Sequence, residues 1–397
     1  MLKNLKEPFQ FVSMLHAIGK HYIINYKEGI NKSFRNPILL DASCNGLQHL
    51  SSMTRDVELA KQTNVIGNWD DNKEKNESLP AKDLYTHAAN LIQKHVEEND
   101  YPESIKQIKF TRKLVKKSIM TIPYNISLTG IQAQIKAHAK EIREFSRPIF
   151  YLPAEFSKLD KPIRLYPSEL KRVGTIVYTV FANELPSLNN LRKYLDSMSK
   201  IILGLDSYIY WITPTGLKIN LSNQKLKSSI FQSRLYSGDR PITISLPTNQ
   251  LDKVAIKRSW MPNLIHSLDS ANIQLFVNKL HIPSPRGEGK ENINIPFYTI
   301  HDCFASLPNS MELLERLVKE AFIEIYFSDN AYVQSLHHQL TEQIRDLTET
   351  KLDENGEEIA KVFIRNKEEW LTIPKLPYSF TDPDLTEKFI KGLTKNP

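Results

Sequence analysis

Residues 37–49, PILLDASCNGLQH, begin with a compact apolar run and pass through Asp41 into a segment typical of a helix start. A short apolar run of this kind is typical of a buried strand, which would deliver Asp41 to the edge of a sheet. Taken alone, Asp41 is equally consistent with the N-cap of a helix. The spacing of Asp41 with Gly46, Gln48 and His49 favours a functional motif, because it should arise by chance in roughly one chain of this length in several hundred.

A second apolar run, PFYTI at residues 296–300, leads into His301 and Asp302. An unpaired buried carboxylate is costly, so this position should contain either a bound cation or a tight turn, and the sequence leaves both alternatives open. As two strand-end carboxylates, Asp41 and Asp302 form a natural pair for Mg²⁺, which is commonly bound by one or two carboxylates together with substrate phosphates. Two such ions would serve phosphoryl transfer.

Between these two acidic motifs, residues 105–122 predict a helix whose basic residues, from Lys106 to Lys117, occur without an intervening acid. One side of this segment carries two cations, a thioether and an aromatic ring, at Arg112, Lys116, Met120 and Tyr124. That face suits a nucleoside triphosphate, because guanidinium and ammonium groups bind phosphates. The alternative is an ordinary solvated basic face. Pro123 is expected to bend or end the last turn, just before Tyr124.

Length, composition and charge describe a folded chain that favours polyanionic partners. The 397 residues are enough for two or three lobes with a sizeable core. Lys and Arg number 52 against 45 Asp and Glu, which gives a net charge of +7. Only two cysteines occur, so a disulfide framework or a structural zinc site is not expected. The N-terminus does not resemble an export signal or a transit peptide, and no apolar stretch is long enough to span a membrane.

The predicted fold class is mixed α/β and rich in helices. Three polar segments, at residues 67–80, 283–296 and 348–358, are expected to be surface loops or insertions. A further region, Trp211 to Leu246, alternates apolar and polar residues around turn signals and predicts β-hairpin material. Apolar spacing of three and four predicts helices over residues 81–99, 105–122, 187–203, 263–280 and 311–347.

These motifs, in this order, resemble the catalytic half of a phage-type, single-subunit DNA-directed RNA polymerase, a family that includes mitochondrial enzymes. The Asp41 motif resembles the first palm motif, the segment from Arg112 to Tyr124 resembles the fingers helix, and His301 to Phe304 resembles the second palm motif. The similarity extends from about residue 8 to about residue 380. Further agreement lies at Pro8-Phe9-Gln-Phe11, at Trp211 to Gly216, and at Pro262-Asn263-x-x-His266-Ser267-x-Asp269.

The resemblance implies a role for each matching residue. Asp41 and Asp302 would bind two Mg²⁺ ions, and Arg112 and Lys116 would hold the incoming triphosphate. Tyr124 would gate the nucleotide pocket, whose face Met120 shares, and would help to sense the ribose 2′-hydroxyl. His266 would assist Tyr124, although a lone histidine of this kind is otherwise more often a hydrogen-bonded core residue. His301 would contact the growing RNA end or brace Asp302.

The resemblance also implies a right-hand architecture. We expect residues 1–80 to form the first part of the palm and residues 267–397 to form its second part with the C-terminal segment. Residues 81–266 would form the fingers, with the nucleotide-binding helix at 105–124 and a hairpin resembling the promoter-probing hairpin at 211–246. That hairpin region is rich in cations, at Lys218, Lys225, Lys227, Arg234 and Arg240, but a simple solvated β-ribbon is the alternative.

Departures from the family pattern limit what the resemblance implies. Asn125 follows Tyr124 where most relatives have glycine, and this version is similar to polymerases encoded on mitochondrial linear plasmids. The chain begins just ahead of the first palm motif, so the family's thumb and N-terminal domain are expected to be missing or supplied as a separate chain. The expected partners are a DNA template, an RNA transcript and ribonucleoside triphosphates, with weak, distributive synthesis by this chain alone. The expected location, from the resemblance only, is the mitochondrion.

Two other functions remain as alternatives. A non-catalytic nucleic-acid-binding remnant of a plasmid polymerase would keep the basic surface without incorporating nucleotides. A family A DNA polymerase shares the His-Asp motif, but its first motif uses a Gln-Ile-Glu type of sequence in place of Gly46-x-Gln48-His49. The sequence therefore favours an RNA polymerase core.

Overall fold

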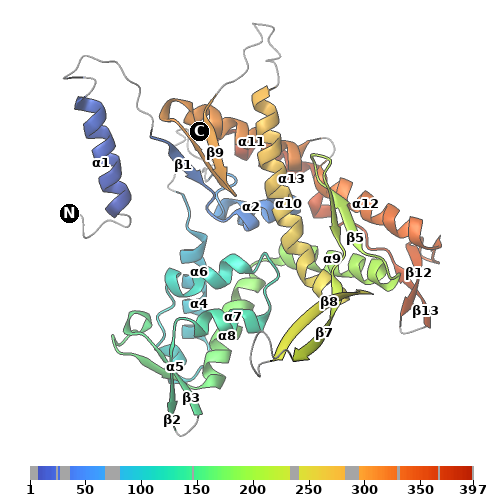
Figure 1. The fold of residues 1–397 in the computed structure, drawn as a ribbon, viewed down its shortest axis with the longest axis horizontal. Coiled ribbons are helices and arrows are strands. Elements are labelled where there is room, and N and C mark those ends of the chain that lie inside the picture. Colours follow the sequence, from blue (N-terminus) through green and yellow to red (C-terminus); the bar gives the residue numbers. More distant parts are fainter. Residues whose placement is uncertain are drawn as a thin grey trace. The chain divides into compact units, whose positions relative to one another are not determined.

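The structure is a computed structural model, and it contains both helices and strands, with helices in the majority, as the sequence predicts (Figure 1). Among the described residues, no helix combines the length and the apolar character needed to cross a membrane. The structure describes residues 8–23, 26, 36–67, 81–144, 147–232, 241–281, 295–328, 331–364 and 367–395.

The chain divides into two compact units, and each is assembled from separate stretches of sequence. The small unit comprises Met1–Ala42 and Asp269–Ile325, and the large unit comprises Ser43–Leu268 and Tyr326–Pro397. Long-range pairing is therefore needed to build either unit.

The small unit is built on a three-stranded antiparallel sheet with the order β1 (Ile38–Asp41), β10 (Cys303–Ser306), β9 (Phe297–Ile300). It also contains α1 (Pro8–Tyr22), most of α11 (Met311–Phe327) and the C-terminal part of α10 (Lys253–His281).

One face of this sheet packs against α10. The ring of Phe276 meets the rings of Phe297 and Phe304 edge-on, at centroid distances of 5.1 and 5.5 Å. Since side chains alternate along a strand, Asp41 and Cys303 lie on the opposite face. On that face Leu39 is 57% exposed and Ile300 is 61% exposed. The expectation that these two apolar runs form buried strands is therefore wrong, because β1 and β9 are the edge strands of the sheet and most of their residues are exposed.

The large unit is mostly helical. Its helices are α2 (Asn45–Thr54), α3 (Val57–Gln62), α4 (Leu84–Glu98), α5 (Glu103–Lys106), α6 (Arg112–Thr121), α7 (Leu128–Lys136), α8 (Pro167–Asn183), α9 (Pro186–Gly204), α12 (Tyr332–Leu347) and α13 (Pro383–Lys395), with the first part of α10. Its strands form four antiparallel sheets: β2 (Lys140–Glu144), β3 (Arg147–Leu152) and β4 (Ile163–Leu165); β5 (Ile209–Ile212) and β6 (Lys218–Leu221); β7 (Gln224–Gln232) and β8 (Pro241–Leu251); and β11 (Thr350–Leu352), β12 (Glu358–Ile364) and β13 (Lys367–Thr372).

The helix predictions hold where the apolar spacing is uninterrupted. The predicted helices over 81–99, 187–203 and 263–280 correspond to α4, α9 and the second part of α10. The single helix predicted over 105–122 is wrong, because Ile108 forms an isolated β-bridge with Ser157 and Thr111 caps a new helix, α6. The helical stretch predicted over 311–347 consists of two helices, α11 and α12.

Several β elements differ from the sequence expectation. The region from Trp211 to Leu246 forms parts of two separate hairpins, β5–β6 and β7–β8, where the sequence suggests one region. Residues 348–358, which the sequence predicts to be a polar loop, contain the strand β11 and the tight turn that joins it to β12. There the Asp353 carboxylate accepts the backbone N–H groups of Asn355 and Glu357, so side-chain hydrogen bonds close the turn. Most of the other two predicted loops lies outside the described residues.

A buried arginine ties the end of α2 to the C-terminal helix α13. Arg55 is only 3% exposed, and its guanidinium donates to the carbonyls of Ser52 and Tyr326 and, at 3.1 Å, to the hydroxyl of Thr386. The guanidinium also lies 4.4 Å from the centre of the Phe327 ring. Burial lowers the pKa of Arg55 to about 10.

The Phe327 ring in turn stacks on the ring of Phe389 in α13, at a centroid distance of 5.3 Å. Removing the Phe389 ring should therefore leave a cavity against the aromatic partner of Arg55. We expect Phe389→Ala to lower the free energy of unfolding by about 3 kcal/mol, measured by urea unfolding followed by circular dichroism. The control Phe363→Ala, at a side chain that is 56% exposed, should change it by less than about 0.5 kcal/mol. Equal effects of the two substitutions would contradict the inference that the Phe389 ring anchors α13 against Phe327.

Candidate active site

The two predicted metal-binding aspartates occupy adjacent strand ends of the small unit. Asp41 is the last residue of β1 and lies directly opposite Cys303, the first residue of β10. Asp302 immediately precedes Cys303. The pairing of β1 with β10 thus brings together two acids that are far apart in the sequence.

The Asp302 side chain comes from a hairpin turn, so the turn interpretation of the His-Asp pair describes its local structure. Ile300 and Cys303 are paired, which leaves His301 and Asp302 as the two connecting residues between β9 and β10. His301 is exposed and has φ 54, in the left-handed region that few residues other than glycine adopt. A turn and an acidic site are therefore compatible. The N-cap alternative for Asp41 is wrong, because Cys44 occupies the N-cap position of α2.

Negative charge is concentrated at this sheet edge. Partial burial, followed by the charges of Asp269 and Asp41, raises the pKa of the Asp302 carboxyl. Burial and the two strand-end acids, Asp41 and Asp302, also raise the pKa of the Cys303 thiol. Asp269, from α10, belongs to the segment quoted for its agreement with the family, but the sequence pattern assigned no role to it.

The donor set suits a hard cation that also binds substrate oxygens. In the described part of the chain, neither Asp41 nor Asp302 has a salt bridge to Lys or Arg. The described residues also contain no group of three or more His, Cys, Asp or Glu side chains arranged as a complete metal site. Two carboxylates that repel each other at a sheet edge fit Mg²⁺, which usually keeps positions for water and phosphate oxygens. They do not fit a closed structural site such as that of zinc.

The predicted triphosphate-binding residues lie on α6 of the large unit. Leu114, Val115, Ser118 and Ile119 are buried, so the opposite face exposes Arg112, Lys113, Lys116, Lys117 and Met120. The helix ends at Thr121, and Tyr124 follows in a turn, as Pro123 predicts. Asn125 has φ 57, in the left-handed region that asparagine adopts more readily than most residues other than glycine.

Arg112 is held by an acid that the sequence interpretation missed. Its Nε donates to the Asp83 carboxylate at 2.7 Å. Partial burial of Asp83 opposes its ionisation, but hydrogen bonds from Thr86 and Arg112 keep the pKa of this carboxyl below its usual value. Asp83 also caps α4, and this N-cap pattern was the available sequence signal.

Lys116, on the exposed face of α6, lies beside the ring of Tyr85. Its Nζ lies 5.5 Å from the centre of the Tyr85 ring, and the Arg112 guanidinium lies 5.4 Å from the same ring. Lys113 forms an ion pair with Glu155 at 2.8 Å. Within the described residues, Lys116 has no carboxylate partner within 4 Å. It therefore offers a cation beside an aromatic ring.

Tyr124 is packed between two of the other quoted motifs. Its ring meets the His266 ring edge-on, at a centroid distance of 5.2 Å. A methyl group built on Gly46 would lie 2.9 Å from both the ring and the hydroxyl oxygen of Tyr124. The glycine of the first motif is therefore required for the position of this tyrosine, a role that its sequence spacing did not reveal.

Other motif residues have structural contacts. Gln48 donates to the carbonyl of Thr63 at 2.9 Å, and the buried His49 hydrogen-bonds through Nδ1 to the hydroxyl of Tyr326 at 2.6 Å. Trp211 is fully buried and donates to the hydroxyl of Ser267 at 3.1 Å. These residues hold the large unit together.

The hairpin β7–β8 carries Lys225 and Lys227 on exposed strands. Lys218 lies on the other hairpin, in β6, with its Nζ 4.0 Å from the centre of the Tyr210 ring. Arg234 and Arg240 lie outside the described residues. The promoter-probing role of this region stays a prediction.

Comparison with known proteins agrees with the motifs. Residues 1–375 match the family described as DNA-dependent RNA polymerase. A probable DNA-directed RNA polymerase of Agaricus bitorquis is 35% identical over 99% of this chain and 36% of the relative. A probable DNA-directed RNA polymerase of Neurospora crassa is 29% identical over 83% of this chain and 36% of the relative.

A more distant relative is the DNA-directed RNA polymerase 1, mitochondrial, of Arabidopsis thaliana, which is 24% identical over 89% of this chain and 33% of the relative. The chain thus spans about a third of the length of these curated relatives. Because the family match includes the Asp41 motif, the basic helix and the His-Asp turn, the chain belongs to the phage-type family of DNA-dependent RNA polymerases.

Proposed function

We propose that this chain contains the nucleotidyltransferase core of a DNA-directed RNA polymerase, which adds ribonucleotides to an RNA 3′ end on a DNA template. The observation that carries the proposal is the pairing of β1 with β10, which puts Asp41 beside the Asp302 turn. Relatives named as DNA-directed RNA polymerases support it. Its substrates and partners would be ribonucleoside triphosphates, a DNA template and the RNA transcript.

The proposed division of labour follows the chemistry of the two units. The Asp41 and Asp302 carboxylates of the small unit would bind two Mg²⁺ ions, with His301 contacting the RNA end or bracing Asp302. Bound there, the ions would lower the pKa of the attacking 3′-hydroxyl and stabilise the leaving pyrophosphate. Lys116 and Arg112 of the large unit would bind the triphosphate beside Met120, and Tyr124 with His266 would contact the sugar. The reaction joins the 3′ oxygen to the α-phosphorus and releases pyrophosphate, while the hydroxyl proton passes to solvent.

The right-hand assignment belongs to the same proposal. Residues 1–80 and 267–397 would form the palm, and residues 81–266 would form the fingers. The name of the Arabidopsis relative supports a mitochondrial location. A separate chain that supplies the N-terminal part of the polymerase, and distributive synthesis without it, remain predictions.

Primer extension tests the catalytic assignment. With Mg²⁺ and all four ribonucleotides, the chain should extend an RNA primer on a single-stranded DNA template. Asp41→Asn or Asp302→Asn should lower the rate about a thousandfold or more, because each removes a metal ligand worth several kcal/mol to the transition state.

Asp196→Asn, at an exposed position of α9 far from the motifs in sequence, is the matched control and should retain the wild-type rate. Template binding without any extension, under every divalent metal tested, would favour the non-catalytic remnant. Extension with deoxyribonucleotides in preference to ribonucleotides would favour a DNA polymerase. In the same assay, a heparin trap captures polymerase that dissociates, so the length of the products made after its addition measures processivity.

Thermal unfolding tests the metal assignment independently of catalysis. Excess Mg²⁺ should raise the Tm of the wild-type chain by about 2–4 °C, because the ion binds only the folded carboxylate pair. Without metal, Asp302→Asn should melt higher than the wild type at neutral pH, since it removes a carboxylate whose ionisation is opposed first by partial burial and then by the charges of Asp269 and Asp41.

The sign of the pH dependence follows from the pKa shift of Asp302. A pKa raised in the folded state means that stability is lost as the pH rises above the ordinary carboxyl range and Asp302 ionises. The advantage of Asp302→Asn should therefore shrink as the pH falls toward that range. An equal Mg²⁺-dependent rise in Tm for Asp302→Asn and wild type would contradict the site.

Sugar selection tests the contact between Gly46 and Tyr124. Gly46→Ala would place a methyl group 2.9 Å from the Tyr124 ring, so the ring must move away from its position beside His266. We expect Gly46→Ala and Tyr124→Phe each to lower the preference for ribonucleotides over deoxyribonucleotides by about tenfold, the scale of one lost hydrogen bond. Single-nucleotide incorporation with ATP and dATP measures the ratio.

Gly19→Ala, where the added methyl would meet no atom within 4 Å, is the matched control. An unchanged sugar preference in Gly46→Ala, with normal activity, would show that Tyr124 does not select the sugar.

A further inference from the structure

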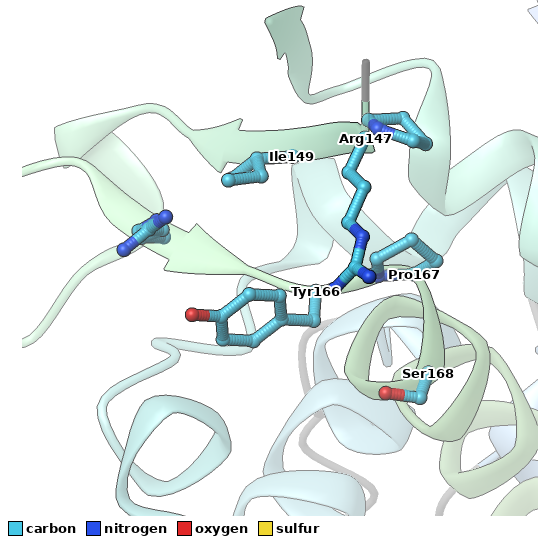
Figure 2. A pocket seen from close by; sticks show the side chains of 7 residues that line it. Arg147, Ile149, Tyr166, Pro167 and Ser168 are labelled. Carbon is cyan, nitrogen blue, oxygen red and sulfur yellow. The ribbon is translucent and has the colours of Figure 1, made fainter. Parts of the chain in front are cut away.

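A surface pocket of about 760 Å³ lies in the large unit, where the sheet β2–β3–β4 meets the start of α8. Arg147 and Ile149 of β3 line it together with Arg164 of β4, followed by Tyr166 and Ser168. Figure 2 shows the Arg147 side chain extending from its strand toward Pro167, while the Tyr166 ring points away from Arg147. No motif discussed above includes any of these residues.

Strand register explains why these side chains share one face. Tyr151 lies opposite Arg164, and alternation along β3 puts Arg147 and Ile149 on the same face as Tyr151. Ile163 and Leu165, the residues on either side of Arg164 in β4, are buried. The face of the sheet opposite Arg164 therefore packs against the core. The arginines are therefore directed to the pocket side by the packing of the strands.

The pocket combines positive charge with an exposed aromatic ring. The guanidinium of Arg164 lies 5.3 Å from the centre of the Tyr166 ring, and Tyr166 is 51% exposed. None of the described residues that line the pocket is acidic. The carboxylate of Glu169, in the first turn of α8, accepts the backbone N–H of Tyr166 at 2.7 Å and the hydroxyl of Ser104 at 2.5 Å. This nearby acid is thus engaged by other donors.

This set of groups matches the chemistry of a nucleotide unit within a strand. Guanidinium groups bind phosphate oxygens through paired N–H donors. An exposed aromatic ring beside a basic groove provides a stacking surface for an unpaired base, and stacking tolerates any base. Bases inside a duplex do not offer their faces, so the arrangement favours a single strand.

We propose that this pocket, lined by Arg147, Arg164 and Tyr166, binds single-stranded nucleic acid, with backbone phosphates of the strand on the two arginines and a base on the tyrosine ring. The proposal rests on the proposed function in one respect, because the single strand would be the template or the transcript of an RNA polymerase. It adds a binding position for that strand outside the catalytic motifs.

The test is the binding of a fluorescein-labelled oligo(dT) of about 12 nucleotides, a length within the range of single-strand sites, to the whole chain. Fluorescence anisotropy is measured over a series of salt concentrations without Mg²⁺ or nucleotides. The double variant Arg147→Ala, Arg164→Ala should bind at least tenfold more weakly. It should also reduce the slope of log K against log salt by about 0.7 for each phosphate that is no longer neutralised.

Tyr166 variants separate stacking from charge. Tyr166→Leu should bind about tenfold more weakly with an unchanged salt slope, whereas Tyr166→Phe should bind as the wild type does, because it keeps the ring. Arg316→Ala, which removes an exposed arginine of α11 in the small unit, is the matched control and should bind normally. Circular dichroism and Tm confirm that each variant is folded.

Several outcomes would overturn the proposal. Wild-type affinity and salt slope in the double arginine variant would do so, as would equal reductions in affinity for Tyr166→Phe and Tyr166→Leu. Competition by free dTMP at the nucleotide concentration of the oligonucleotide would identify a small-molecule pocket instead of a strand site. Primer extension, measured in parallel, keeps the two proposals distinct. If the wild-type chain does not extend a primer but the pocket variants still bind the oligonucleotide more weakly, the proposed function fails and the pocket proposal stands. If the wild-type chain extends the primer but the pocket variants bind as the wild type does, the pocket proposal fails and the proposed function stands.

Discussion

The pairing of β1 with β10 is the constraint on which the candidate active site depends. It joins a strand near the start of the chain to a hairpin about 260 residues later, and it fixes Asp41 opposite the residue after Asp302. Backbone hydrogen bonds set this register, so a slip by one residue would turn Asp41 toward α10 and separate the acids. The aromatic contacts of Phe276 with Phe297 and Phe304 fix which face of β9 and β10 packs against α10.

The acidic edge of the β1–β10–β9 sheet and the basic helix α6 differ in whether their charged groups have partners. At the sheet edge, Asp41, Asp269 and Asp302 repel one another, and that repulsion is relieved when a cation binds. On α6, by contrast, part of the positive charge already has partners: Arg112 is paired with Asp83, and Lys113 with Glu155. The net charge of the chain says little about either site. Local pairing decides which groups have charge to offer a substrate.

The sequence predicted the family, the mixed fold and the long helices, because each depends on patterns that are local or that recur as motifs. It did not predict the break between α5 and α6, which depends on Ile108 bridging to Ser157. It also missed the sheet β2–β3–β4 and the full β11–β13 sheet, whose short strands carry weak periodicity. The motifs identified the candidate residues, but they did not predict which other residues these contact. The packing of Gly46 against Tyr124, and of Asp83 against Arg112, joins residues that no spacing rule relates.

The carboxylate of Asp83 divides its two oxygens between separate tasks. One oxygen, Oδ1, accepts the N–H groups of Tyr85 and Thr86 at the start of α4, while Oδ2 accepts the hydroxyl of Thr86 and the Nε of Arg112. Transfer of the guanidinium to a competing anion would therefore leave the first turn of α4 intact. Release of Arg112 from Asp83 would therefore cost the hydrogen bond between them but not the N-cap of α4.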